Sequence, residues 1–128
     1  MAIANDRDKY HETCTTRLED HPGPVLVPAL VVLEVCQVLA SRRGTRSESS
    51  FLNSVAAGEL RLVDLTNADY GRCAELVTRY ADLPLGTADA SVIAVAERLN
   101  VAEIATLDRR HFSIVRPKHV PAFTLLPG

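Results

Sequence analysis

The chain has 128 residues, of which 47% are hydrophobic and 23% are charged, as expected for one globular domain spanning residues 1–128. A chain of this length buries roughly two thirds of its unfolded surface, which is enough for a core without disulfides or a structural metal. The 14 Lys and Arg against 16 Asp and Glu give a formal net charge of −2, which excludes a global positive field for nucleic acid. Any nucleic-acid site must therefore be local.

The cysteines and the hydropathy pattern indicate an intracellular protein. Cys14, Cys36 and Cys73 are far apart, and each falls on an expected apolar helix face, which is typical of buried thiols in a reducing compartment. No segment approaches the ~18 to 20 uncharged apolar residues of a transmembrane helix. Residues 1–9 become charged before a signal-peptide core could form. We expect a cytoplasmic protein with no membrane segment.

Helical and extended patterns alternate along the first half of the chain. Tyr10, Cys14 and Leu18 recur every four residues, and Pro and Gly mark the segment boundaries. These patterns predict a helix from Asp6 or Asp8 to the breakers at 21–24, a strand at 25–27, a largely buried helix at 29–40, a helix from about Ser47 to Gly58, and a strand at 60–65.

The second half continues the alternation. It predicts a helix capped by Asn67 or Asp69 and ended by residues 82–86, a helix at 88–99 capped by Thr87, a strand at 102–107, a turn at 108–112, and a strand at 122–126. Strands that alternate with helices predict an α/β fold in which a parallel sheet is covered on both faces.

Glu34 is the first of three carboxylates near the ends of expected strands, where open α/β sheets bind ligands. It is the only charged residue between Val25 and Arg42, and its helical neighbours are apolar. A buried, unpaired carboxylate would cost several kcal/mol. Glu34 is therefore either paired with an arginine from elsewhere in the fold, or is a metal ligand or general base.

Asp89 and Asp108 are weaker signals when each is taken alone. Asp89 falls in the first turn after Thr87, where the helix dipole favours any carboxylate, and Asp108 is also an ordinary turn residue. Three acids that converge on one site would suit Mg²⁺ or Mn²⁺. Zinc is not favoured, because metal-ligand spacing is absent among His11, His21, His111 and His119.

Basic residues form two clusters, which are usually solvated surface. One consists of Arg42, Arg43 and Arg46, and the other of Arg109, Arg110, Arg116 and Lys118. The second cluster adjoins Asp108 and could hold a phosphate backbone. Neither a Gly-rich phosphate loop nor a G-x-S-x-G motif occurs, so nucleotide-cradling and serine-hydrolase functions have no motif behind them.

Three features in order resemble the PIN-domain ribonucleases, and most closely the VapC toxins of bacterial toxin–antitoxin pairs. They are Pro28 followed by the Glu34 helix, then Gly86-Thr87-Ala88-Asp89-Ala90, then Thr106-Leu107-Asp108-Arg109-Arg110-His111-Phe112. The resemblance covers about residues 5–127. It implies a three-layer α/β/α fold whose parallel sheet gathers acidic residues around one or two Mg²⁺ or Mn²⁺ ions for RNA cleavage.

The resemblance also assigns residue roles. It implies that Glu34, Asp89 and Asp108 are catalytic and metal-binding, that Thr106 lies near the metal, and that Arg109 or Arg110 holds the RNA backbone. The family's first acid follows the first, central strand in a hydrophobic-Asp-Thr/Ser-x-x-Leu motif, and this motif is absent. Residues 1–8 resemble the tail of the next helix, and Asp6 and Asp8 belong to the loop after it. We therefore expect an N-terminally truncated PIN domain without its central strand.

The function expected from this resemblance is that of a Mg²⁺- or Mn²⁺-dependent endoribonuclease toxin that uses metal-activated water. It implies a homodimer and a VapB-type antitoxin. A catalytically impaired PIN-like domain that binds antitoxin or RNA without cleaving is the main alternative. A different Mg²⁺-dependent phosphotransfer domain is the weaker one, because no D-x-D pair ends a strand.

Overall fold

The structure is a computed structural model that describes residues 2–3, 25–106 and 109–126. The helix expected from Asp6 or Asp8, together with Cys14 and Asp108, lies outside these residues. The elements in chain order are β1 (Ala2–Ile3), β2 (Leu26–Pro28), α2 (Ala29–Arg42), α3 (Thr45–Ala56), β3 (Arg61–Val63), α4 (Asn67–Arg79), α5 (Thr87–Leu99), β4 (Glu103–Ala105), α6 (Arg109–Ile114) and β5 (Thr124–Leu126).

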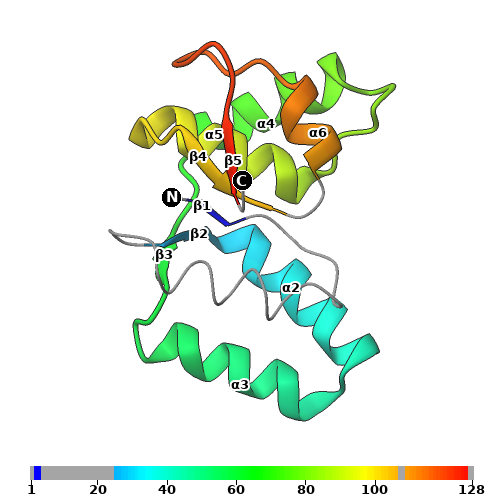
Figure 1. Cartoon of the computed structure of the whole chain (residues 1–128), viewed down its shortest axis with the longest axis vertical. Coiled ribbons are helices and arrows are strands. Elements are labelled where there is room, and N and C mark those ends of the chain that lie inside the picture. Colours follow the sequence, from blue (N-terminus) through cyan, green and yellow to red (C-terminus); the bar gives the residue numbers. More distant parts are fainter. Residues whose placement is uncertain (1, 4–24, 107–108, 127–128) are drawn as a thin grey trace.

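The described strands form one parallel sheet in the order β3-β2-β1-β4-β5 (Figure 1). Ala2 lies opposite both Leu26 and Ile104, so β1 occupies the central place. The expectation that the central strand is missing is therefore wrong. The physical reason is that β2 and β4 are each only three residues long, so even a two-residue strand can bridge them and pair their inner backbone groups.

Helices cover the sheet and confirm the three-layer α/β/α arrangement. Figure 1 shows α2 and α3 in the lower half of the molecule and α4, α5 and α6 in the upper half. Helix α5 packs against α4, α2, β1 and β2, which makes it the most central helix of the described residues. Its residues from Ala90 to Ala96 are all buried. The position of α5 is thus fixed from several sides.

Helix α2 has one buried face rather than being buried all round. Val31, Val35 and Leu39 lie in the core, whereas the side chain of Leu33 is 61% exposed. The expectation of a largely buried helix is therefore wrong for the outer face. Helix α2 packs against α3, α5 and β2.

Two helix caps differ from the sequence expectation. The hydroxyl of Thr66, rather than Asn67 or Asp69, caps α4 by accepting from the Asp69 N–H, and the Asp69 carboxylate accepts from the Thr66 N–H. This reciprocal pair satisfies two backbone donors at the start of the helix. Helix α5 begins at Thr87 itself, so the residue before it, Gly86, takes the cap position without a side-chain hydrogen bond.

The segment expected to be a turn at 108–112 contains the start of a helix. Residues 109–114 form α6, which buries Phe112 against the core, and the ring of Phe112 meets that of Phe123 edge-on at 6.5 Å between centroids. Burial of this aromatic side chain stabilises a helical turn that its short sequence does not specify.

The prediction of buried thiols is confirmed for Cys36 and Cys73, which are buried and free. Burial raises the pKa of both thiols, and the nearby carboxylates of Glu48 and Asp69, respectively, raise the pKa further. Both groups are therefore poor nucleophiles at neutral pH. No helix in the described part of the chain is long and apolar enough to cross a membrane.

Candidate functional site

Glu34 and Asp89 come from different helices and interact with each other. Pro28 ends β2 and is the N-cap of α2, which places Glu34 in the second turn of that helix. Asp89 lies in the first turn of α5, which packs against α2. Burial raises the pKa of Glu34, and the negative charge of Asp89 raises it further. The fold thus brings together two carboxylates that are 55 positions apart, from 34 to 89.

Among the residues that the structure describes, Glu34 forms no ion pair with an arginine, which was one of its two interpretations. The ion pairs among the described residues join other acids to Arg72, Arg98, His111 and Lys118. The charge that acts on Glu34 is of the same sign. Within the described residues, this carboxylate is therefore left with a repulsive neighbour, which favours the interpretation as a ligand or base.

His111 is a third member of the site, and sequence reasoning missed it. Its Nδ1 lies 3.4 Å from Oδ2 of Asp89, and the two side chains are 12% and 21% exposed. His111 belongs to α6, whereas Asp89 belongs to α5, and β4 lies between these two helices in the sequence. A search for metal-ligand spacing could not find it, because its partner is an acid from another helix. The available signal was its place three residues after Asp108.

Thr106 lies at the carboxyl edge of the sheet. It follows β4 directly, is buried, and donates its backbone N–H to the carbonyl oxygen of Leu126 at 2.9 Å. Since all described strands are parallel, this is the edge at which β2 also ends and α2 begins. Asp108 is outside the described residues, as are the side chains of Arg109 and Arg110.

The donor set fits a hard divalent cation with an incomplete protein shell. No group of three or more His, Cys, Asp or Glu side chains within the described ranges could hold a metal ion. Glu34 and Asp89 supply two carboxylates, and Mg²⁺ commonly takes only one or two carboxylates besides water and phosphate oxygens. Two like charges near one another also gain from a cation between them. The chemistry of this pair therefore suits Mg²⁺ or Mn²⁺.

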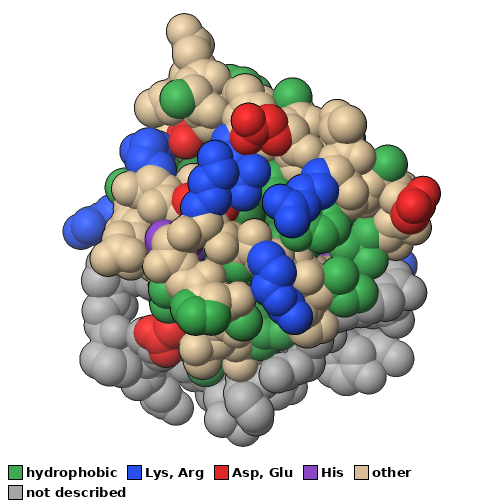
Figure 2. Space-filling model, turned by 90° about the horizontal axis from the view of Figure 1, so that it is seen from above, with side chains coloured by type: hydrophobic (Ala, Val, Ile, Leu, Met, Phe, Trp, Pro, Cys, Tyr) green, Lys and Arg blue, Asp and Glu red, His purple; other side chains and the backbone are tan. Residues whose placement is uncertain are grey.

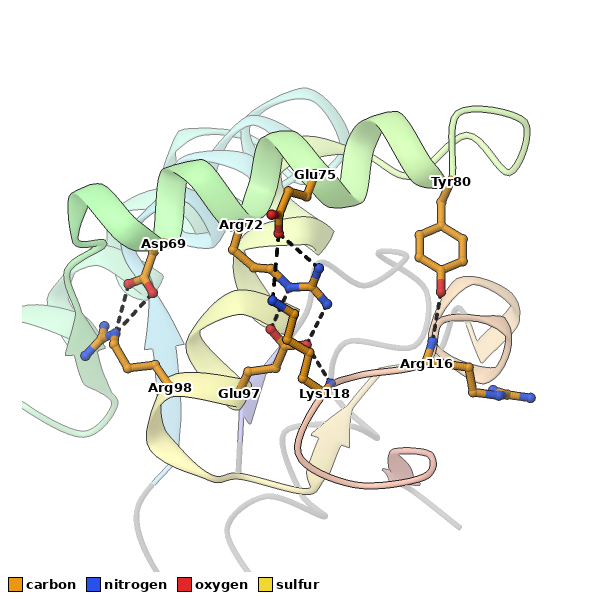
Figure 3. Close-up of polar contacts among 8 residues, drawn as sticks. All are labelled: Asp69, Arg72, Glu75, Tyr80, Glu97, Arg98, Arg116 and Lys118. Carbon is orange, nitrogen blue, oxygen red and sulfur yellow. Dashed lines mark hydrogen bonds and ion pairs between the residues drawn. The ribbon is translucent and has the colours of Figure 1, made fainter.

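A second group of charges fastens α4 to α5 and to the chain before β5 (Figure 3). Arg72 pairs with Glu97, and Arg98 pairs with Asp69. The backbone N–H of Lys118 donates to Glu97 Oε2 at 2.9 Å. On the face seen in Figure 2, Lys and Arg side chains lie beside Asp and Glu side chains rather than forming an unbroken basic patch. The ion pairs of Arg72 and Arg98 and the hydrogen bond from Lys118 therefore hold α4, α5 and the segment before β5 together.

The remaining members of the second basic cluster make local contacts. The Arg116 guanidinium donates to the carbonyl oxygen of Ser113 at 2.8 Å, and its backbone N–H donates to the hydroxyl of Tyr80 at 3.1 Å. The Lys118 ammonium lies 4.0 Å from Glu75. These contacts occupy both side chains on the surface that joins α4 to the C-terminal segment.

Comparisons with known proteins bear on the family and the fold of the chain. The family model described as "PIN domain" matches residues 1–116. The chain is 33% identical over 127 residues to Ribonuclease VapC26 of Mycobacterium tuberculosis, with 99% of this chain and 94% of the relative covered. It also superposes on the crystal structure of Mycobacterium tuberculosis VapC20, described as a sarcin-ricin loop cleaving toxin, with a TM-score of 0.79 and 18% identity. That match covers 94% of this chain and 98% of the other.

Proposed function

The chain belongs to the PIN-domain family, as a VapC-type ribonuclease, and on this premise we propose that it is a divalent-metal-dependent endoribonuclease toxin. The observation that carries the proposal is that α2, which begins at the carboxyl edge of the sheet and carries Glu34, packs against α5, which carries Asp89, so that the charge of Asp89 raises the pKa of Glu34. A site for a phosphodiester and a cation needs acids at that edge.

The three acids have proposed roles in metal binding and in activation of water. Asp89 is a direct metal ligand, Asp108 is a direct or water-mediated ligand, and Glu34 is a ligand or the base that orients the attacking water. The raised pKa of Glu34 supports the second role, because this carboxylate accepts a proton more readily than an ordinary one. When bound, Mg²⁺ or Mn²⁺ supplies charge that polarises the phosphate and lowers the pKa of a coordinated water.

The other proposed residues bind or orient groups at the site and take no part in the chemical step. Thr106 is buried at the same edge of the sheet, and we assign to its hydroxyl the role of a polar group near the acids. Arg109 and Arg110 open α6 directly after Asp108, and we assign to them the RNA backbone, since guanidinium groups bind phosphate oxygens in a fork geometry.

Cleavage of total tRNA and rRNA by the full chain in Mg²⁺ tests the proposal. Asp89→Asn keeps the side-chain shape and removes the charge, so the cleavage rate should fall about 100-fold or more while circular dichroism is unchanged. Asp82→Asn is the matched control, because Asp82 is an exposed residue between α4 and α5. Undiminished cleavage by Asp89→Asn contradicts the site. A folded parent that binds RNA without cutting it supports the alternative of a PIN-like binding domain.

We also infer a VapB-type antitoxin and a second copy of the chain as partners. The support is membership of the VapC type, together with apolar surface such as Leu33 and Tyr70 that the described residues leave exposed. Light scattering of the purified chain at several concentrations should give the mass of a dimer. A monomer mass at all concentrations contradicts this inference.

A further inference from the structure

His111 is a partly buried side chain that the proposed chemistry does not use. Its Nδ1 lies 3.4 Å from Oδ2 of Asp89. Its Nε2 is buried and has no hydrogen-bond partner among the described residues. A buried polar atom without a partner requires a physical explanation. We explain the unpaired Nε2 by the contact that Nδ1 of the same ring makes with Asp89.

The surroundings of the two nitrogens select one tautomer. A carboxylate oxygen only accepts, so attraction requires a proton on Nδ1. In the neutral ring, Nε2 then carries a lone pair. A buried acceptor without a partner is less costly than a buried N–H without one. The geometry therefore favours a proton on Nδ1 of His111.

The backbone on both sides of this contact is firmly held. Phe112, the next residue, is buried in the core and packs on Phe123, so α6 cannot rotate His111 away without exposing an aromatic ring. Asp89 lies on α5, which packs against two helices and two strands. The contact thus joins a side chain on one fixed helix to a side chain on another.

We propose that His111 is a positioning residue for Asp89: its Nδ1–H donates to Oδ2 and holds the carboxylate in the orientation that the site uses. The role rests on the proposed function above, in which Asp89 is a ligand. The distance of 3.4 Å exceeds the usual 2.9–3.0 Å, and contacts of this kind often tighten when a site is loaded. Partners that orient a ligand typically contribute 10–100-fold to metal affinity.

The first test is the tautomer of His111 in the unmodified full chain. Imidazole ¹⁵N chemical shifts in mildly alkaline buffer report which nitrogen carries the proton. His119 is an internal contrast, because its Nε2 lies 2.7 Å from the carbonyl oxygen of Val101 and must donate there. We expect the Nδ1–H form at His111 and the Nε2–H form at His119, with signals assigned by their loss in His111→Asn and His119→Asn. The Nε2–H form at His111 would overturn the proposal.

The second test is Mn²⁺ affinity, measured by calorimetry without RNA. Leu at position 111 fills space without a donor, whereas Asn places an N–H near the former Nδ1. We expect His111→Leu to raise the Mn²⁺ Kd about 10–100-fold and His111→Asn to raise it less than about 3-fold. His119→Leu, a change at another partly buried histidine, should leave the Kd unchanged. In the Asp89→Asn background, His111→Leu should add nothing.

The outcomes separate this inference from the proposed function. Equal Kd values for the parent and a folded His111→Leu, or equal losses in the Leu and Asn variants, overturn the positioning role. A parent that binds no Mn²⁺ contradicts the metal site itself, and the tautomer measurement then decides whether His111 holds Asp89. If His111→Leu does not fold, His111→Gln replaces it, since Gln places its amide near Nε2 and should fail to restore the affinity.

Discussion

The guanidinium of Arg72 binds the carboxylate of Glu97 through two hydrogen bonds, Nε to Oε1 at 2.8 Å and Nη2 to Oε2 at 2.9 Å. The pair joins α4 to α5, and both side chains are largely buried. Such a fork is stronger than a single charged contact and fixes geometry as well. The C-terminal half of α5 is thereby held in place, and the same helix carries Asp89 in its first turn.

Glu97→Gln should destabilise the protein at neutral pH. Burial raises the pKa of Glu97, but the hydrogen bonds and charges of Arg72 and Lys118 lower it by more, so the net pKa is below the ordinary value. Ionised Glu97 therefore stabilises the fold above the unfolded pKa, and this contribution is lost as pH falls through the folded pKa. We expect a loss of about 2 kcal/mol near neutral pH that shrinks in acid, measured by urea unfolding.

Glu75→Gln is the matched control for this prediction. Glu75 also contacts Arg72, at 3.3 Å, but its side chain is 62% exposed. An exposed ion pair contributes little, so the variant should lose less than about 0.5 kcal/mol. Equal losses in the two variants, or a Glu97→Gln effect that does not depend on pH, would show that the buried pair is not the source of the stability.

Thr66→Ala should cost about 1 kcal/mol of unfolding free energy, because the Thr66 hydroxyl accepts from the Asp69 N–H at the start of α4. The Asp69 carboxylate keeps its ion pair with Arg98, so the helix should remain in place. Thr78→Ala, in the exposed last turns of the same helix, is the control and should change stability by less than about 0.5 kcal/mol. Thermal unfolding followed by circular dichroism distinguishes the two results.

Glu34→Gln should stabilise the metal-free protein while it weakens metal binding. Because burial and Asp89 raise the pKa of Glu34, the stability that protonated Glu34 contributes is lost as pH rises through its folded pKa. Removal of the charge should raise the metal-free Tm by about 2 °C at neutral pH and by less in acid. The Kd for Mn²⁺ should rise about tenfold or more.

Glu59→Gln, at an exposed position after α3, is the control for this pair of measurements and should change neither the Tm nor the Kd. A higher metal-free Tm together with weaker Mn²⁺ binding in Glu34→Gln would identify Glu34 as a site residue. Substitution of a purely structural residue would lower the Tm instead. A lower Tm together with unchanged Mn²⁺ affinity in Glu34→Gln would remove this residue from the site.

Local pattern was sufficient for much of the fold. The apolar segment at 29–40 predicted α2, and the apolar run from Ala88 predicted α5, because helices and short strands reflect patterns among near neighbours. The same local logic placed Asp89 in a first turn. It could not show that Asp89 and Glu34 interact, since no spacing rule connects positions on two separate helices.

The sequence by itself determined the alternation of helices and strands and the parallel sheet, and it singled out Glu34, Asp89 and Asp108 as candidate site acids. Only the tertiary structure decided that Ala2–Ile3 lies at the centre of the sheet, that 109–114 is helical and that His111 meets Asp89. A two-residue strand and a six-residue helix are too short to be stable alone. Their conformations come from neighbours distant in the chain, which the sheet order and core packing bring together.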